Sequence, residues 1–316
     1  MLDYFFSYTI LQVMILQDYI ESFKQRYNRK YLSFKEEFLS SGLSEILTNS
    51  LFYTPDSGGK LLRSIFAFRS CEIFEVPYEI SENLAIALEL FQSFTLIHDD
   101  LPSLDNDDFR RGKASLHRAF DTPTAILTGD ALSLLTFTLF TKPFISKEFS
   151  RKLKKSTKPN SSNLNHPIFS RWYSGIIDLI HFFSSDVAVK ELIDGQILDT
   201  LNSKNNLDIE SYIKIYEKKT GSLFGFSFAA GAILAKNQYA KEKLYSAGLA
   251  FGIAFQIMDD SQDINKENET NLLCILEKQN AQKLFNSYKK KALTTLHEFD
   301  PEILYSLADE TLKIKK

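Results

Sequence analysis

The residue types that could do chemistry concentrate in one stretch, HDDLPSLDNDDFRRGKASLHR, which occupies residues 98–118. Carboxylates at helical neighbour spacing repel one another, so such a cluster is unfavourable in an isolated fold. Divalent cations and an anionic ligand would neutralise it, because carboxylates bind hard cations and arginines bind phosphate. The stretch therefore indicates a metal–diphosphate site. Its acids are Asp99, Asp100, Asp105, Asp107 and Asp108, and its cations are Arg110, Arg111 and Lys113.

A second acidic segment, FGIAFQIMDDSQD, ends another apolar run. It places Asp259, Asp260 and Asp263 in a DDxxD pattern, with Gln256 one helical turn earlier. Acids at a helix C-terminus oppose the helix dipole, so two such ends argue against a chance arrangement.

Three further segments combine cations or polar groups with glycine. In SGGKLLRS the glycines allow a tight turn, and a helix starting there would place Lys60 and Arg63 on one face near its N-terminus, where anions bind. Each segment is a weak signal alone, because solvated turns and surface helices give the same patterns. The other two are GQILD, with Gln196 and Asp199, and EKKTGSLF, with Lys219 and Thr220.

The spacing inside the first acidic stretch predicts a distorted helix end. Asp99 and Asp105 are six residues apart, which a straight helix would place about 240° apart around its axis. Pro102 disfavours helix at the preceding residue and removes a backbone donor. We therefore expect a kink that carries Asp105 back towards Asp99.

Other functional classes fit less well. A His-Asp phosphohydrolase needs more paired histidines than the five scattered ones, and SLDNDDF lacks the central Gly and closing Glu of an EF-hand. A net charge of -3 argues against general nucleic-acid binding. Cys71 and Cys274 lack metal-ligand spacing, so we expect buried thiols in a reducing compartment and a cytoplasmic protein.

The elements that must position these residues are helices. Apolar residues recur at three- and four-residue spacing, without sustained period-two alternation, which predicts an all-α fold. Residues 146–170, rich in Ser, Lys and Asn, predict a solvated insertion or flexible loop. The apolar N-terminus lacks a basic region and a cleavage site and is too short to span a bilayer, so we expect a core or interface helix, with peripheral membrane contact as the alternative. The predicted helical segments are 84–98, 124–144, 172–201, 208–235 and 241–258.

Taken in order, GGKLLRS, LIHDDLPSLDNDDFRRGKASLH, AILTGDAL, GQILD, KKTGSLF and FQIMDDSQD make the chain resemble the trans-isoprenyl diphosphate synthases of the farnesyl/geranylgeranyl diphosphate synthase family. The resemblance runs from about residue 45 to the C-terminus. It implies one polyprenyl synthetase domain over residues 1–316, an all-α isoprenoid synthase-type bundle around a central cavity, and usually a homodimer. Leu61 and Ser64 depart from the family's GGKRxRP, and Lys266 is the candidate replacement for a family lysine absent at Asn268.

The resemblance also implies roles for individual residues. The two aspartate motifs would face each other across the cavity mouth, where three Mg²⁺ ions bridge them to an allylic diphosphate. The implied metal ligands are Asp99, Asp100, Asp105, Asp199, Asp259 and Asp263. The allylic diphosphate would contact Arg110, Lys219, Thr220 and Gln256, and isopentenyl diphosphate would contact Lys60, Arg63, Gln92 and Arg111. The catalytic set is Asp99, Asp100, Asp105, Arg110, Lys219 and Asp259, and Phe94 and Thr95 would set chain length.

The expected reaction is Mg-dependent head-to-tail transfer of a prenyl group from dimethylallyl or geranyl diphosphate to isopentenyl diphosphate. Phe94 lies five residues before Asp99, about 7.5 Å along a helix, so its ring would limit the pocket to a short product. We therefore expect farnesyl diphosphate. The alternatives are a geranylgeranyl or geranyl diphosphate synthase, or a weakly catalytic subunit that regulates a partner. Nucleic acid and stable membrane insertion are not expected.

Overall fold

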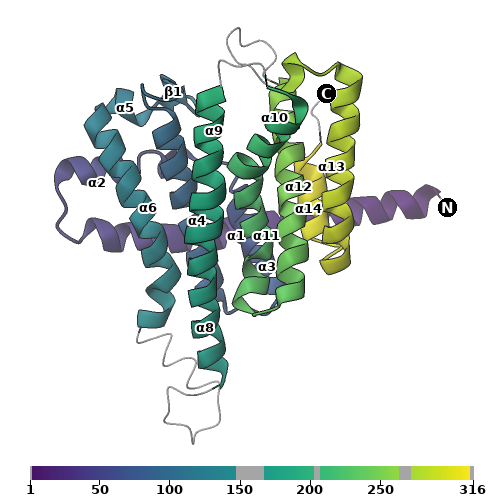
Figure 1. Cartoon of the computed structure of the whole chain (residues 1–316). Helices are drawn as coiled ribbons and strands as arrows, with labels where there is room; N and C mark the ends of the chain where they lie inside the picture. Colours follow the sequence, from purple (N-terminus) through teal and green to yellow (C-terminus); the bar gives the residue numbers. More distant parts are fainter. Residues whose placement is uncertain (1, 147–166, 203–206, 263–271, 314–316) are drawn as a thin grey trace, which may run out of the picture. The chain divides into compact units, whose positions relative to one another are not determined.

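The computed structural model describes residues 2–146, 167–202, 207–262 and 272–313, and the regular secondary structure within these ranges is helical apart from one short hairpin (Figure 1). The all-α prediction is therefore confirmed. The chain divides into two compact units. The C-terminal unit comprises Met1–Tyr19, Arg69–Val76 and Ser170–Lys316, and the N-terminal unit comprises Ile20–Phe68 and Pro77–Phe169. The expectation of one domain stays a prediction.

Three helices contribute residues to both units. They are α1 (Leu2–Leu39), α3 (Leu62–Ile73) and α8 (Pro167–His181). The remaining elements of the N-terminal unit are α2 (Glu45–Leu51), η1 (Pro55–Ser57), α4 (Tyr78–Asp99), β1 (Phe109–Arg110), β2 (Lys113–Ala114), α5 (Leu116–Ala119) and α6 (Thr122–Ile145).

The core of the N-terminal unit forms where α4 packs against α6 (Figure 1). Helix α6 begins at Asp121, whose side chain accepts a hydrogen bond of 2.7 Å from the Thr124 amide, with Pro123 in the first turn. Both are favoured helix-start features. Its buried positions repeat at three- and four-residue spacing, including Ala125, Leu132 and Leu139, each with no exposed area. This packing fixes α4, which carries the first acidic motif at its C-terminal end.

The sequence did not predict the hairpin of β1 and β2. Its strands pair antiparallel, Phe109 with Ala114 and Arg110 with Lys113. Arg111 and Gly112 form the turn with φ of 54° and 78°, the left-handed conformation that two-residue hairpin loops require. Two-residue strands are too short to show a period-two pattern, and the hairpin decides where Arg110 and Arg111 point.

The C-terminal unit is built from consecutive helices. Helix α11 is buried at every position, as expected for an apolar helix at the centre of its unit. The predicted helices over 172–201 and 208–235 are present but contain π-helical segments, η2 and η3. The elements are α8 (Pro167–His181), η2 (Phe182–Ile193), α9 (Asp194–Asn202), α10 (Ile209–Tyr216), η3 (Glu217–Gly221), α11 (Ser222–Leu234), α12 (Gln238–Gln262), η4 (Leu272–Cys274), α13 (Lys278–Phe299) and α14 (Leu304–Thr311).

Glycines let α12 approach its neighbours closely. A Cβ built on Gly252 would lie 2.4 Å from the Cα of Gly221, and one built on Gly248 would lie 2.4 Å from the Cα of Gly225. Helices α11 and α12 run side by side, and α13 packs next to α12 (Figure 1). Because the backbones touch, α12 and its acidic end are held firmly against η3 and α11.

The sequence analysis also made predictions about the insertion, membrane insertion and the cysteines. Most of the predicted insertion 146–170 lies outside the described residues. Helix α8 begins at Pro167, so the last four residues of the predicted insertion are helical. Helices α4 and α6 are long and apolar enough to cross a membrane by length and composition, a test that the core helix of a soluble protein also passes. The α4 window is 72% buried, as in a core helix. Cys71 is a buried free thiol, as predicted.

Candidate active site

The first acidic motif lies where α4 ends. The helix stops at Asp99, and the chain then turns so that the Asp105 amide donates to the Asp99 carbonyl at 2.9 Å. Asn106 completes the turn with φ of 54° and donates its amide to Leu101. Asp99 is half-buried and Asp105 is exposed. The predicted distortion after Pro102 is thus present, and it places two carboxylates on adjacent backbone.

Asp100 lies in a different environment from these two acids. It is 2% exposed, and its carboxylate accepts hydrogen bonds from Nε (2.8 Å) and Nη2 of Arg110. Nη2 also donates to Asp107 at 2.9 Å. Burial raises the pKa of Asp100, and the neighbouring Arg110 offsets only part of this increase. Burial alone would lower the pKa of Arg110, but its hydrogen bonds to Asp100 and the charge of that residue raise it. The pair fixes Arg110 at the acidic end, and a metal-binding role for Asp100 stays a prediction.

Arg111 points to the glycine turn before α3. Its Nη1 donates to the Gly58 carbonyl, and a Cβ on Gly59 would lie 3.0 Å from its Cζ. The turn contains Gly58 at φ 78° and Leu61 at φ 53°. The structure therefore brings Arg111 together with the SGGKLLRS segment, as expected for residues that share one anion.

One detail of the sequence analysis was wrong. Helix α3 begins at Leu62, not at the glycines, because Leu61 takes a left-handed conformation that ends any helix before it. Lys60 is exposed in the turn and Arg63 is half-buried in the first helical turn, so the two do not share a helical face.

Sequence reasoning missed Glu89, a buried carboxylate one turn before Gln92 on α4. Glu89 is 8% exposed and accepts a hydrogen bond of 3.0 Å from Ser64, whose hydroxyl also donates to the Ala85 carbonyl at 2.6 Å. Burial raises its pKa, while Ser64, Arg63 and Arg111 lower it. A lone Glu within the apolar run ALELF was the available signal.

Phe94 and Thr95 occupy the helical turn behind Asp99. Phe94 is half-buried, and its ring centroid lies 5.2 Å from that of Phe91 and 4.8 Å from that of His98. Thr95 donates to the Gln92 carbonyl at 2.9 Å, a bond within the helix. Phe94 is therefore packed between aromatic rings on both sides along α4.

In the C-terminal unit, the GQILD and KKTGSLF segments meet. Lys219 donates to Asp199 at 2.6 Å, which joins η3 to α9. A Cβ on Gly195 would lie 2.6 Å from the Lys219 amide nitrogen, so the close approach needs glycine. Lys218 points elsewhere and pairs with Glu191 and Asp194, each at 3.1 Å. The π-helical turn of η3 thus separates two consecutive lysines, a feature often found at functional sites.

A hydrogen-bonded chain connects η3 to the second acidic motif. Thr220 donates to Gln256 at 3.0 Å, and Gln256 donates to Asp260 at 2.9 Å. Tyr216 also donates to Asp260, which sequence reasoning did not predict. Burial and the charge of Asp260 raise the pKa of Tyr216, so its hydroxyl remains protonated. Asp259 is half-buried on the same helix, and the predicted ligand Asp263 and Lys266 lie outside the described residues.

The donor chemistry of these acids fits Mg²⁺. Carboxylate oxygens are its preferred protein ligands, and Mg²⁺ is usually bound by one or two carboxylates together with substrate phosphates. Among the described residues, no group of three or more His, Cys, Asp or Glu side chains is close enough to hold a metal by itself. The predicted ligands among the described residues are Asp99, Asp100 and Asp105 in the N-terminal unit and Asp199 and Asp259 in the C-terminal unit.

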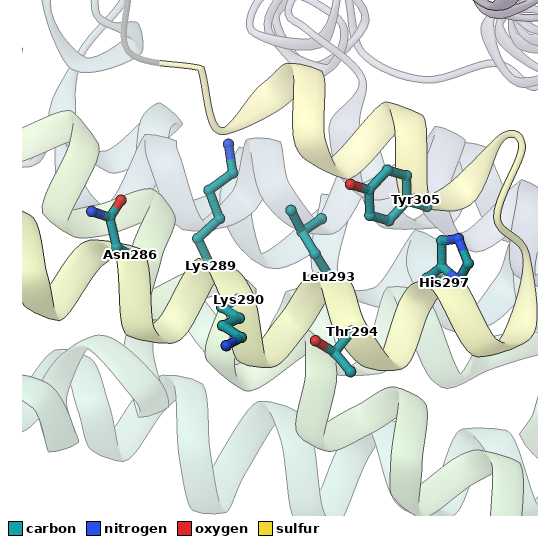
Figure 2. A pocket seen from close by; sticks show the side chains of 7 residues that line it. All are labelled: Asn286, Lys289, Lys290, Leu293, Thr294, His297 and Tyr305. Carbon is teal, nitrogen blue, oxygen red and sulfur yellow. The ribbon is translucent and has the colours of Figure 1, made fainter.

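A separate pocket of about 530 Å³ lies along α13 and α14 (Figure 2). None of the predicted site residues lines it. One of its lysines, Lys289, already pairs with Asp309 at 2.9 Å and donates to the Leu312 carbonyl at 3.1 Å. Its lining therefore does not account for the chemistry of the acidic motifs. The lining residues are Asn286, Lys289, Lys290, Leu293, Thr294, His297 and Tyr305.

Comparison with known proteins gives matches along most of the chain. A family model described as polyprenyl synthetase matches residues 44–272. A dimethylallyltranstransferase of Fischerella ambigua (strain UTEX 1903) is 32% identical over 72% of this chain and 60% of that enzyme. A geranylgeranyl diphosphate synthase of Cyanophora paradoxa is 34% identical over 72% of this chain and 69% of that enzyme. A farnesyl diphosphate synthase of Bacillus subtilis (strain 168) is 30% identical, with the same two coverages.

Solved structures share the fold. A geranyltransferase from Legionella pneumophila superposes with a TM-score of 0.75 at 24% identity, covering 95% of this chain and 96% of that one. A geranyltranstransferase from Thermotoga maritima gives a TM-score of 0.67 at 28% identity, covering 90% and 96%. The expected isoprenoid synthase-type helical fold is therefore confirmed.

Proposed function

Because this chain belongs to the polyprenyl synthetase family, we propose that it transfers an allylic prenyl group from its diphosphate to isopentenyl diphosphate. The observation that carries the proposal is that two consecutive arginines contact two different segments. Arg110 bonds to Asp100 and Asp107 beside the acidic turn, whereas Arg111 bonds to the glycine turn that precedes Arg63. A reaction of two diphosphates needs two anion sites close together, and this hairpin supplies a cation to each.

The chemistry requires charge stabilisation and not a protein nucleophile. Mg²⁺, when bound, supplies positive charge to the leaving diphosphate. Arg110 and Lys219 are the proposed fixed cations for the leaving diphosphate, and stabilising its charge would favour breaking the allylic C–O bond. Lys60, Arg63 and Arg111 hold isopentenyl diphosphate so that its double bond attacks the carbocation, and the proton then released goes to the departed pyrophosphate. Apolar walls must exclude water, which would otherwise capture the cation.

The product is proposed to be farnesyl diphosphate. Phe94 supports this choice, because its half-buried ring is held between Phe91 and His98 one to two turns behind Asp99. A growing prenyl chain that extends along α4 would meet this ring after a short product. Sequence identity does not choose the product, since the relatives include both a farnesyl and a geranylgeranyl diphosphate synthase.

The first prediction tests the chain-length role. Phe94→Ala should shift the main product from fifteen carbons to twenty or more, because the stop is removed while the metal ligands remain. Chromatography of the dephosphorylated products measures the shift. Phe91→Leu is the matched control, since Phe91 is 3% exposed in the core and should not alter product length. Unchanged products in Phe94→Ala would exclude this role.

The proposed activity itself is tested with purified protein, Mg²⁺, isopentenyl diphosphate and either dimethylallyl or geranyl diphosphate. We expect release of pyrophosphate and one dominant prenyl product. A dominant C10 or C20 product would support the geranyl or geranylgeranyl alternative. No turnover with any allylic substrate would contradict the proposal and favour a regulatory subunit.

We also propose that the protein is a homodimer that uses three Mg²⁺ ions per site and is located in the cytoplasm. Leu127 and Leu134 support a dimer, because they lie two turns apart on α6 and are 65% and 68% exposed. Light scattering during size-exclusion chromatography would give the mass, and a monomer would contradict the dimer.

A further inference from the structure

Tyr216 lies at the junction of three segments of the C-terminal unit. It ends α10 and is 7% exposed, so its hydroxyl is inside the protein. The hydroxyl donates to Asp260 near the end of α12 and accepts a hydrogen bond of 3.1 Å from the amide of Leu272 at the start of η4. A phenol has one donor and can also accept, so both capacities are used. One hydroxyl therefore connects the end of α12, which precedes residues 263–271, to the start of η4, which follows them.

Asp260 is held from both sides. One carboxylate oxygen accepts from Tyr216, and the other accepts from Gln256 at 2.9 Å. Asp260 is 7% exposed, whereas its neighbour Asp259 is half-buried. Consecutive residues of a helix point about 100° apart, so fixing Asp260 against Tyr216 also fixes the direction of Asp259.

The same contacts reach the candidate diphosphate-binding residues. Gln256 accepts a hydrogen bond of 3.0 Å from Thr220, which follows Lys219 in η3. Tyr216 immediately precedes η3, so it is connected to this segment both through the backbone and through Asp260 and Gln256. Loss of the hydroxyl would loosen the end of α12 and leave the Leu272 amide and one Asp260 oxygen without this partner.

We propose that Tyr216 is a positioning residue that holds the end of α12, through Asp260, and the start of η4, through the Leu272 amide, so that Asp259 is directed at Mg²⁺ and the allylic diphosphate. This inference rests on the proposed function. In this role Tyr216 acts as an outer-shell group, through its bonds to Asp260 and the Leu272 amide. Removal of such groups typically reduces metal affinity or activity by about 10- to 100-fold.

The test is Tyr216→Phe, which removes the hydroxyl and keeps the ring. We expect the Mg²⁺ concentration for half-maximal rate and the KM for the allylic diphosphate each to rise about tenfold, at the low end of outer-shell effects. The KM for isopentenyl diphosphate should not change, because its proposed ligands belong to the N-terminal unit. A purely structural role would lower stability without this selective change.

Tyr19→Phe is the matched control. Tyr19 donates to Glu72 at 2.8 Å, so the variant also loses a hydrogen bond from a tyrosine to a carboxylate in the same unit, and neither residue belongs to an acidic motif. It should leave the Mg²⁺ midpoint and both KM values unchanged. Equal Mg²⁺ midpoints for the two variants would overturn the role of Tyr216, even if both lower Tm.

A second measurement separates this inference from the proposed activity. The rise in Tm caused by Mg²⁺ with inorganic pyrophosphate requires binding but no turnover. We expect a smaller rise for Tyr216→Phe than for wild type and Tyr19→Phe. If wild type shows this rise but no prenyl transfer, the proposed function fails while the positioning role is still decided by the variants. A wild type without turnover or stabilisation, or equal stabilisation of all three proteins, overturns the positioning role.

Discussion

At the scale of single residues, the site is organised by carboxylates that are buried as well as by those that are exposed. Asp100, Glu89 and Asp260 are 2%, 8% and 7% exposed, and each accepts hydrogen bonds from another protein side chain. Buried charge is costly unless it is paired and hydrogen-bonded, so these acids fix the orientation of their partners. The exposed or half-buried acids, Asp99, Asp105 and Asp259, are the ones accessible to ligands.

Glu89 gives a prediction on stability against pH. Burial raises its pKa, which Ser64, Arg63 and Arg111 only partly offset. The folded state therefore binds the proton more tightly than the unfolded state, and this group lowers stability as pH rises from about 4.3, the unfolded value, through the folded pKa. Glu89→Gln stays neutral and keeps the shape of the side chain. Its Tm relative to wild type should therefore increase between pH 4 and pH 7.

Thermal unfolding of both proteins across this pH range measures the effect. Ser64→Ala is the companion variant, because it keeps the carboxyl but removes its 3.0 Å hydrogen bond. It should increase the loss of stability on raising the pH, opposite to Glu89→Gln. A Tm difference between Glu89→Gln and wild type that does not change with pH would contradict the prediction.

At the scale of elements, the turns and helix contacts that place the site depend on glycine in two physically different ways. At Gly59 an added Cβ would meet the end of the flexible Arg111 side chain at 3.0 Å. At Gly252 it would meet the backbone of Gly221 at 2.4 Å, which cannot move without shifting α12 or η3. The same substitution should therefore affect ligand binding at one position and stability at the other.

Gly59→Ala should raise the KM for isopentenyl diphosphate several-fold with little change in Tm, because only Arg111 must move. Gly252→Ala should destabilise the protein by about 1–3 kcal/mol, the usual cost of overpacking a core. Steady-state kinetics and denaturant unfolding of both variants measure the two effects. The prediction fails if Gly59→Ala loses stability like Gly252→Ala, or if its KM for isopentenyl diphosphate is that of wild type.

The sequence could predict the features of these elements that depend on neighbouring residues, but not the contacts between residues distant in sequence. Apolar periodicity located the helices, and Pro102 predicted the turn that joins Asp105 to Asp99, because both signals are local. The bonds of Arg110 to Asp100 and of Tyr216 to Asp260 join residues 10 and 44 positions apart. They depend on a hairpin with two-residue strands and on helix packing, neither of which produces a periodic pattern in the sequence. The start of α3 was misjudged because Leu61 adopts a conformation that is uncommon for its residue type.

At the scale of the whole molecule, the chemistry is divided between two compact units. Asp99, Asp105, Arg110 and Arg111 belong to the N-terminal unit, and the C-terminal unit contributes Asp199, Lys219 and Asp259. The proposed mechanism assigns residues of both units to one leaving diphosphate, and this assignment can be tested without reference to the structure.

A double-mutant cycle tests this assignment. Asp99→Asn and Asp259→Asn each remove one carboxylate charge, and each should lower kcat by roughly 100-fold or more, as expected for loss of a group that stabilises the leaving diphosphate. If both act on one diphosphate, the double variant should lose little more than the worse single variant, because residues that act as a unit are strongly non-additive. Product formation from labelled isopentenyl diphosphate measures these low rates.

The pair Asp99→Asn and Tyr19→Phe provides the additive reference, since Tyr19 donates to Glu72 within the C-terminal unit and belongs to neither acidic motif. Independent sites add in free energy, so this pair should show the rate loss of Asp99→Asn alone. If the losses of Asp99→Asn and Asp259→Asn instead multiply, the two motifs do not share a diphosphate. The second acidic motif would then need a role outside the leaving group, and the proposed mechanism would be wrong in its central step.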